Sequence, residues 1–289
     1  MRHFGHDKKQ RNERPNGPNA PKRPRRDFSR DPRERAEEAA RPSDDLCWGR
    51  NPVLTLLEET PARCLKVVVS KTMQKGMFDR LTGLCKTVGI PFSLVEPKIL
   101  DAMTPGENHQ GVVAVASPTE MMTLEAAMAL LPPQPGAALA VLMDHVQDPH
   151  NLGAMIRSAE AAGATFAALP LRRSSLPTGT VVKTSAGASL RFPIASVGNT
   201  AAAVRDFQEA GLWTVGLDAE ASTTIYDALL PARTLLVVGA EGKGLTKTTA
   251  DACDEVMRIP IGGGVGSLNA SAALAVAMFE WSRTNGGAG

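Results

Sequence analysis

The sequence contains few aromatic residues and no long apolar run. Phe, Trp and Tyr make up 4% of its 289 residues, which argues against recognition of RNA on an aromatic stacking platform. No apolar stretch reaches the roughly 18 residues that a membrane-spanning helix needs, and the N-terminus lacks the apolar core of a signal peptide. We therefore expect neither a membrane span nor a secretion signal.

Cysteine is also scarce. The four cysteines are scattered, without a CxxC pair or a histidine at the spacing of a metal ligand. This usage predicts neither disulfides nor zinc, and it fits a protein of the reducing cytoplasm. The histidines His109, His145 and His150 show no ligand spacing either, so we assign no metal.

Charge is distributed unevenly, although 32 basic and 30 acidic residues nearly balance. Residues 1–45 contain 13 Lys/Arg and 9 Asp/Glu, and this segment is rich in Pro and Arg. Such a composition buries too little apolar surface to fold, so it predicts a disordered basic arm. The excess positive charge suits a polyanion such as RNA; a solubilising tail is an equally good interpretation.

Beyond the arm, apolar runs of strand length alternate with helical patterns. Runs at 65–69, 91–95 and 112–116 predict a small α/β domain over residues 46–117, with its first helix capped by Asn51. Residues 118–137 are expected to form a linker. Six further strands, alternating with helices over 138–289, are predicted at 138–143, 165–169, 193–197, 212–217, 234–238 and 255–259. This alternation predicts a parallel sheet with helices on both faces.

Three segments of the second domain place polar residues where a predicted strand gives way to a loop. DPHN (148–151) follows the first strand of this domain, GAEGKG (239–244) carries Glu241, and GGGVGSLN (262–269) precedes the last helix. Open α/β sheets bind ligands at the carboxyl ends of their strands, and glycines let the backbone approach a ligand closely. The sequence therefore predicts a small-molecule site built from these loops.

Each segment also has a purely structural interpretation. Asn151 could cap the helix that begins near Leu152, Glu241 could cap the next helix, and Ser267 or Asn269 could cap the last one. Arg157 is different, because it lies among Ala, Met and Ile. An arginine in an apolar setting needs a phosphate or carboxylate partner.

The glycine patterns exclude two common nucleotide sites. The GK pair of GAEGKG is followed by Gly244 rather than by the Ser or Thr of a P-loop. Neither glycine segment has the spacing of a Rossmann fingerprint. A nucleotide-dependent dehydrogenase is therefore disfavoured.

Taken together and in this order, three motifs resemble those of the SpoU/TrmH family of RNA ribose 2′-O-methyltransferases, which belong to the SPOUT class. The motifs are DPHNLGAMIRSAEAAG, VVGAEGKGL and IPIGGGVGSLNASAA, and the resemblance covers about 138–283. WGRNPVLTLLEE and GENHQGVVAVA are similar to the N-terminal substrate-binding domain of the RlmB-type branch, which has a ribosomal-protein-like α/β fold. Many relatives have Val on either side of the second Ser of SLNASAA, a difference we interpret as a packing variation.

The resemblance implies a deep trefoil knot at the C-terminus, S-adenosylmethionine as methyl donor and an obligate homodimer. It places cofactor-binding groups at Gly239, Ile259 and Leu268. It places the active-site positions at Asn151, Arg157, Glu241, Ser267 and Asn269. The implied substrate is a guanosine of 23S ribosomal RNA, with transfer RNA as the alternative. A non-catalytic RNA-binding or ribosome-assembly factor of the same fold is a further alternative, although it would not need all five active-site residues.

Overall fold

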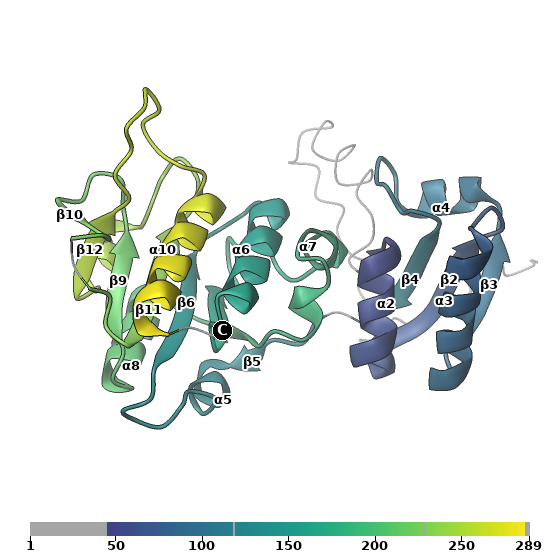
Figure 1. Ribbon diagram of the computed structural model, residues 1–289, viewed down its shortest axis with the longest axis horizontal. Coiled ribbons are helices and arrows are strands. Elements are labelled where there is room, and N and C mark those ends of the chain that lie inside the picture. The colour runs from purple at the N-terminus through teal and green to yellow at the C-terminus, as the bar shows by residue number, and fades with distance from the viewer. Residues whose placement is uncertain (1–44, 118, 228, 287–289) are drawn as a thin grey trace, which may run out of the picture. The chain divides into compact units, whose positions relative to one another are not determined.

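The computed structural model describes residues 45–117, 119–227 and 229–286. The predicted disorder of the basic arm concerns residues that, apart from Asp45, lie outside these ranges. The described residues form two sheets, one of four strands and one of eight, with helices packed against each (Figure 1). None of the helices described is long and apolar enough to cross a membrane.

The first domain is a small α/β layer structure, as its sequence predicts. Its sheet has the order β1-β4-β2-β3, with β1 at Leu46–Trp48, β2 at Cys64–Ser70, β3 at Phe92–Val95 and β4 at Val112–Ala116. Strands β1 and β2 run antiparallel to β4, and β3 runs parallel to β2. Helices α2 (Arg50–Glu59) and α3 (Lys75–Val88) share a core with one face, and α4 (Pro97–Met103) packs on the other. The cap of α2 is Gly49 rather than the predicted Asn51, because the helix already begins at Arg50.

The second domain contains the predicted parallel sheet. All hydrogen-bonded neighbours in the order β10-β12-β9-β11-β6-β7-β8-β5 are parallel. The strands are β5 (Met122–Thr123), β6 (Ala138–Asp144), β7 (Phe166–Pro170), β8 (Ile194–Val197), β9 (Trp213–Leu217), β10 (Thr223–Thr224), β11 (Arg233–Gly239) and β12 (Glu255–Arg258). The six predicted strands are confirmed; the sequence did not predict the short strands β5 and β10 at the two edges.

Helices cover both faces of this sheet. They are α5 (Leu124–Met128), α6 (Pro149–Ala161), α7 (Gly179–Thr184), α8 (Thr200–Glu209), α9 (Lys247–Ala250) and α10 (Ala270–Asn285). Side chains alternate along a strand, so Leu139 and Val141 of β6 lie on opposite sides from Ala140 and Leu142. The first pair joins the core under α6 and α10, and the second joins the core under α8. Burial on both faces explains the continuous apolar runs of the sequence.

The segment expected to be a plain linker is partly structured. Residues Met122–Thr123 form β5, which pairs in parallel with β8, and Thr123 caps α5 by accepting a hydrogen bond from the amide of Ala126 at 3.2 Å. A two-residue strand leaves no periodic pattern from which it could be predicted. Part of 118–137 therefore belongs to the larger sheet.

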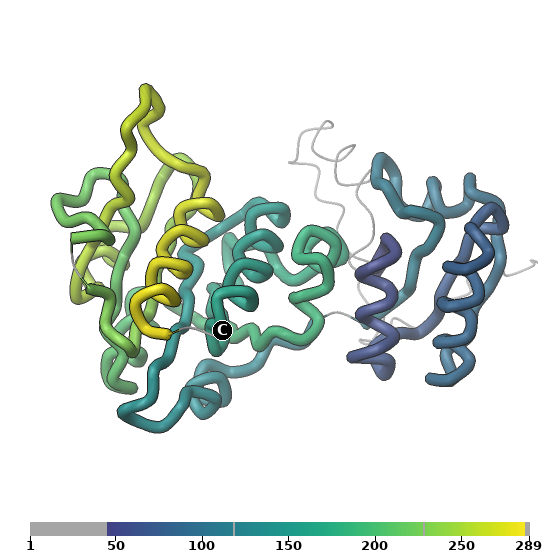
Figure 2. The backbone as a smooth tube through the Cα atoms, in the orientation of Figure 1, coloured from purple at the N-terminus to yellow at the C-terminus, as the bar shows by residue number. Residues whose placement is uncertain are grey.

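The chain returns to the middle of the sheet after β12. Figure 2 shows the connecting loop projecting before α10 runs back beside α6. Trp281 Nε1 donates to the carbonyl of Pro231 at 2.9 Å, and Ser282 Oγ donates to that of Ala162 at 2.8 Å. These bonds attach the last helix to the segments that precede β7 and β11.

Candidate active site

The site lies where the parallel strands end. Strand β11 lies between β6 and β9, with Gly239 opposite Asp144, and β12 lies on the other side of β9. Because parallel strands end at one edge of a sheet, the loops that follow them meet there. A cavity of about 720 Å³ opens at this edge, within the size range of small-molecule sites, about 300–1,000 Å³. Its lining residues fall within 217–220, 238–244, 257–261 and 266–273.

The wall formed by 239–244 is a tight turn that requires glycine at its first position. A Cβ atom on Gly239 would overlap the carbonyl group of Gly244. The turn closes through a hydrogen bond of 2.9 Å from the amide of Gly244 to the carbonyl of Ala240. Glu241 stands on this turn with an exposed side chain. The close approach of backbone to backbone thus gives the glycine-rich motif a physical explanation.

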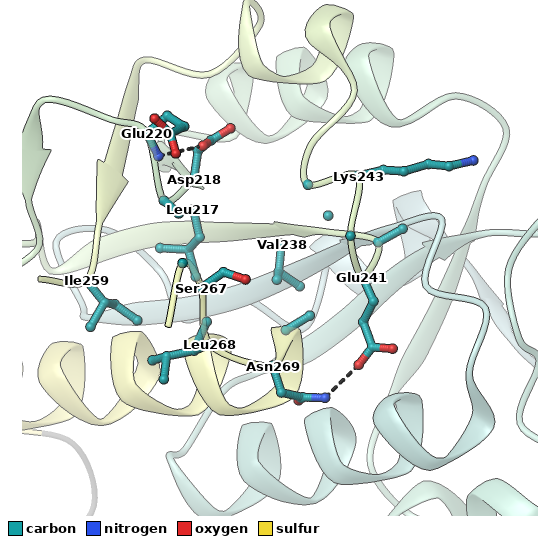
Figure 3. A pocket seen from close by; sticks show the side chains of 18 of the residues that line it. Leu217, Asp218, Glu220, Val238, Glu241, Lys243, Ile259, Ser267, Leu268 and Asn269 are labelled. Carbon is teal, nitrogen blue, oxygen red and sulfur yellow. Dashed lines mark hydrogen bonds between the residues drawn. The ribbon is translucent and has the colours of Figure 1, made fainter. Parts of the chain in front are cut away.

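Three of the predicted active-site residues form one hydrogen-bond network. Asn269 Nδ2 donates to Glu241 Oε1 at 2.6 Å, as Figure 3 shows, and to Asn151 Oδ1 at 3.1 Å. Asn151 Nδ2 donates to the same Glu241 oxygen and to Asp148 Oδ2, the latter at 3.1 Å. Two amides from different motifs therefore converge on one carboxylate oxygen.

The helix caps differ in part from the structural interpretations given above. Helix α6 begins at Pro149 and not near Leu152, and Asp148 is its cap, accepting from the amide of His150 at 2.9 Å. Asn151 is therefore inside the first turn, and its amide is free to reach Glu241. Helix α9 is capped by Thr246, not by Glu241.

Asn269 caps α10, as its structural interpretation predicts, and also takes part in the network. Its Oδ1 caps α10 by accepting from the amides of Ser271 at 2.8 Å and Ala272 at 3.3 Å. Its Nδ2 remains available for the network described above. Capping thus fixes the direction in which this side chain donates.

Arg157 is not part of this network. Its side chain is exposed, and it forms no hydrogen bond or ion pair with any residue in the described ranges. The prediction of an apolar setting was wrong, because Arg157 faces solvent while its neighbour Ile156 faces the core. Six residues place it about 9 Å along the helix from Asn151. Arg157 is not among the residues that line the pocket.

The remaining predicted residues lie at the pocket. Gly239, Ile259, Leu268 and Ser267 all line it, and Ser267 is exposed. Sequence reasoning missed three charged lining residues, Asp218, Glu220 and Lys243. The position of Asp218 directly after a predicted strand was the available signal for the first of these.

The lining combines apolar side chains with acidic groups. Leu217, Val238 and Met257 line the pocket beside Ile259 and Leu268, and such side chains suit a flat ring. The carboxylates of Asp218, Glu220 and Glu241 outnumber the ammonium of Lys243 in the lining. The site therefore suits a ligand that has an apolar part and positive charge.

Comparisons with known proteins agree with this architecture. Residues 138–279 match the sequence model of the SpoU rRNA Methylase family, and residues 46–122 match that of RNA 2′-O ribose methyltransferase substrate binding. Two curated relatives are named 23S rRNA (guanosine-2′-O-)-methyltransferase RlmB. The relative from Vibrio vulnificus is 34% identical over 238 residues, covering 82% of this chain and 96% of its own. The relative from Xanthomonas campestris is 36% identical over 240 residues, covering 83% and 96%.

Solved structures share the fold. The SpoU methyltransferase AviRb from Streptomyces viridochromogenes, in complex with AdoMet, has a TM-score of 0.67 at 25% identity, covering 82% of this chain and 89% of its own. An AdoMet-bound rRNA methyltransferase from Sinorhizobium meliloti has a TM-score of 0.68 at 24% identity, covering 87% and 90%.

The chain has a substrate-binding domain, followed by a parallel-sheet domain with a glycine-walled pocket. Both family matches assign this arrangement to the RNA methyltransferases. The chain belongs to the SpoU rRNA methylase family.

Proposed function

We propose that this S-adenosylmethionine-dependent RNA ribose 2′-O-methyltransferase modifies a guanosine of 23S ribosomal RNA. The observation that carries the proposal is the Asn151–Glu241–Asn269 network beside a glycine-walled pocket. The specific substrate is supported by curated relatives that bear this activity in their names and match this chain over more than four fifths of its length.

The pocket fits the cofactor in size and in chemistry. Its apolar side chains suit an adenine ring, and the surplus of carboxylates complements a sulfonium and an ammonium group. When bound, S-adenosylmethionine supplies an electrophilic methyl group. We assign adenine and ribose binding to main-chain groups around Gly239, Ile259 and Leu268, since all three line the cavity.

The protein has two tasks at the ribose. A ribose hydroxyl is a poor nucleophile because it holds its proton tightly, so the enzyme must orient the 2′-oxygen and help remove that proton. Asn151 holds the 2′ or 3′ oxygen, and Glu241 fixes the direction of both amides by accepting from Asn151 and Asn269. Ser267 and Asn269 shape the substrate side of the pocket.

Arg157 aligns the RNA. A guanidinium holds its proton too tightly to be a good base, but it binds a phosphate in a bidentate manner. Arg157 therefore clamps the phosphate beside the target ribose. That phosphate, or a transiently neutral Arg157, receives the proton.

A homodimer completes the site in this proposal. Arg157 is exposed and outside the pocket of its own protomer, so it serves the pocket of a second copy. We place the partner contact at α10, where the apolar side chain of Phe279 is 50% exposed.

A deep trefoil knot is proposed for the C-terminal segment. Support comes from family membership and from the path of the chain, which leaves β12 at one side of the sheet and returns to pack α10 against α6 and β11. The crossing glycine-rich loops would then enclose the cofactor on several sides.

RNA selection is assigned to the first domain and the basic arm. Residues 46–122 match a substrate-binding model, and the arm adds 13 Lys/Arg that can contact phosphates. Phosphate contacts give affinity but little sequence information, so the domain selects a folded ribosomal RNA hairpin by its shape. The enzyme acts in the cytoplasm, where ribosomal RNA is made.

The experiment that tests this function uses purified protein, tritiated S-adenosylmethionine and total RNA from a strain that lacks the gene. Label at one guanosine of 23S ribosomal RNA, mapped as a ribose methylation, is the expected result. Label in transfer RNA would support the proposed reaction but contradict the proposed substrate. Absence of label, together with full methylation of RNA in the deleted strain, would instead support the non-catalytic RNA-binding factor.

A further inference from the structure

A buried carboxylate lies directly behind the pocket wall. Asp144 is the last residue of β6, and its side chain is 0% exposed. It pairs with no lysine or arginine in the part of the chain that the structure describes. Among the described residues its ionisable partner is His145, whose Nδ1 lies 2.6 Å from Oδ1. A carboxylate without a strong cation is costly to bury unless hydrogen bonds satisfy it.

Hydrogen bonds from several segments satisfy this carboxylate. Its Oδ2 accepts from the amide of Thr246 at 3.1 Å, and its Oδ1 lies 2.6 Å from His145 Nδ1. Burial by itself would raise the pKa of Asp144, but the interactions with Thr246, Thr200, His145 and Thr249 outweigh burial and hold the pKa below its ordinary value. The group is therefore an ionised carboxylate at neutral pH, surrounded by donors.

Asp144 is connected to both ends of the Glu241 turn, to one end through its backbone and to the other through its carboxylate. Gly239, at the start of the turn, lies opposite Asp144 in the β6–β11 ladder. Thr246, at the end of the turn, donates its amide to the carboxylate and caps α9. The residues between them include Glu241 and form one wall of the pocket.

We infer that Asp144 is a positioning residue for the reaction, holding the 239–246 turn in the shape that walls the pocket and directs Glu241 toward Asn151 and Asn269. The inference rests on the proposed function, since it gives a role to a pocket that binds the cofactor. Asp144 does not line the pocket, so it acts through the turn and not on substrate.

Asparagine is a sharp probe of this role. Asp144→Asn keeps the size of the side chain but replaces one acceptor oxygen by an NH₂ donor. Where this NH₂ group takes the place of Oδ2, it faces the amide of Thr246, and two donors cannot bond to each other. Where it takes the place of Oδ1, it faces His145 Nδ1, and the amide of Thr246 bonds to a neutral oxygen, which is a weaker acceptor than a carboxylate. In both cases the Thr246 end of the turn loses its charged hydrogen bond.

The chain offers a matched control. Asp254 also accepts a backbone amide and a threonine hydroxyl, both from Thr214 to its Oδ2 at 2.8 Å. It does not line the pocket. Asp254→Asn therefore removes bonds of the same kind without touching the Glu241 turn.

Isothermal titration with S-adenosylhomocysteine, on the full-length protein, tests the inference. We expect Asp144→Asn to weaken binding by roughly tenfold or more, the loss typical of a charged hydrogen bond, while Asp254→Asn stays near wild type even if its Tm falls. Titrations run well below both melting temperatures separate this effect from unfolding. Equal affinity of Asp144→Asn and wild type would overturn the inference; failure of the wild type to bind would overturn the proposed function as well.

A double-mutant cycle measured in kcat distinguishes a positioning role from general destabilisation. In wild type, Glu241→Gln should lower kcat; in Asp144→Asn it should lower kcat little further, because Glu241 is already misplaced. Additive losses would contradict the inference.

Should Asp144→Asn fail to fold, Thr246→Pro tests the same bond from the donor side. Thr246 has a φ of −66°, which proline adopts, and proline lacks the amide hydrogen. It should weaken S-adenosylhomocysteine binding in the same way, and unchanged binding would contradict the proposed role.

Discussion

Asn151 and Asn269 are 118 residues apart in the sequence, yet Asn269 Nδ2 donates a hydrogen bond of 3.1 Å to Asn151 Oδ1. Both amides also donate to one oxygen of Glu241. Side chains from two segments of the chain thus donate to a single acceptor on a third segment. The orientation of both asparagines depends on a carboxylate that neither motif contains.

Glu241→Gln should disable this arrangement without changing the shape of the side chain. A glutamine still offers one oxygen to the two amides, but this oxygen carries no charge, so both hydrogen bonds are weaker than those to a carboxylate. Loss of a hydrogen bond to a charged group is worth about 1.5–3 kcal/mol, so we expect kcat to fall roughly 10- to 100-fold. Single-turnover methylation at saturating RNA measures this, with Glu255→Gln of β12 as a control that should leave the rate unchanged. A normal rate in Glu241→Gln would show that the network is dispensable.

Arg157 should act on the pocket of the other protomer. Arg157→Ala and Glu241→Ala are each expected to abolish activity as homodimers. If the site is shared, mixed dimers of the two variants contain one intact site, so an equimolar mixture should recover about a quarter of wild-type activity.

The control for this mixing experiment replaces Arg157→Ala by Arg205→Ala, an exposed arginine of α8 that should be fully active by itself. Mixed dimers without any recovery would show that each site takes Arg157 and Glu241 from the same protomer, which would refute the shared arrangement. Arg157→Lys should also lose activity while retaining RNA binding, because lysine cannot form the bidentate contact.

Gly239→Ala should damage both stability and cofactor binding. Its methyl group would overlap the backbone of Gly244, and relieving that overlap requires the turn to open. Overpacking of this kind costs about 1–3 kcal/mol. Urea unfolding and S-adenosylhomocysteine titration measure the two effects. Gly198→Ala, where no atom lies within 4 Å of the added methyl, should be neutral, and an equally neutral Gly239→Ala would contradict the geometry.

The free energy of unfolding should depend on the ionisation of Asp144 at acid pH. Burial would raise its pKa, but the interactions with Thr246, Thr200, His145 and Thr249 outweigh burial, so the pKa is lower in the folded protein than its ordinary value. A depressed folded-state pKa contributes stability above the unfolded-state pKa, about 3.9, and that contribution is lost as the pH falls through the folded-state value. The difference in unfolding free energy between wild type and Asp144→Asn should therefore narrow below about pH 4. A difference that stays constant from pH 7 to pH 3 would count against an ionised Asp144.

Strand positions could be read from the sequence for a physical reason. A strand covered on both faces is apolar at nearly every position, so runs such as 138–143 and 234–238 stand out. The strands that were missed, β1, β5 and β10, have two or three residues and lie at sheet edges. Such strands form because a neighbouring strand is available, and their own sequence carries no pattern.

The sequence by itself determined the two-domain α/β organisation, the order of the three motifs and the set of polar groups at the strand ends. The tertiary structure decided what those groups do. Helix α6 begins at Pro149, so Asn151 does not cap it. Arg157 faces solvent, and Asp144 lies behind the Glu241 turn. The reason is that strand and helix patterns are local, whereas the partner of a polar side chain is set by segments that lie close in space and far apart along the chain.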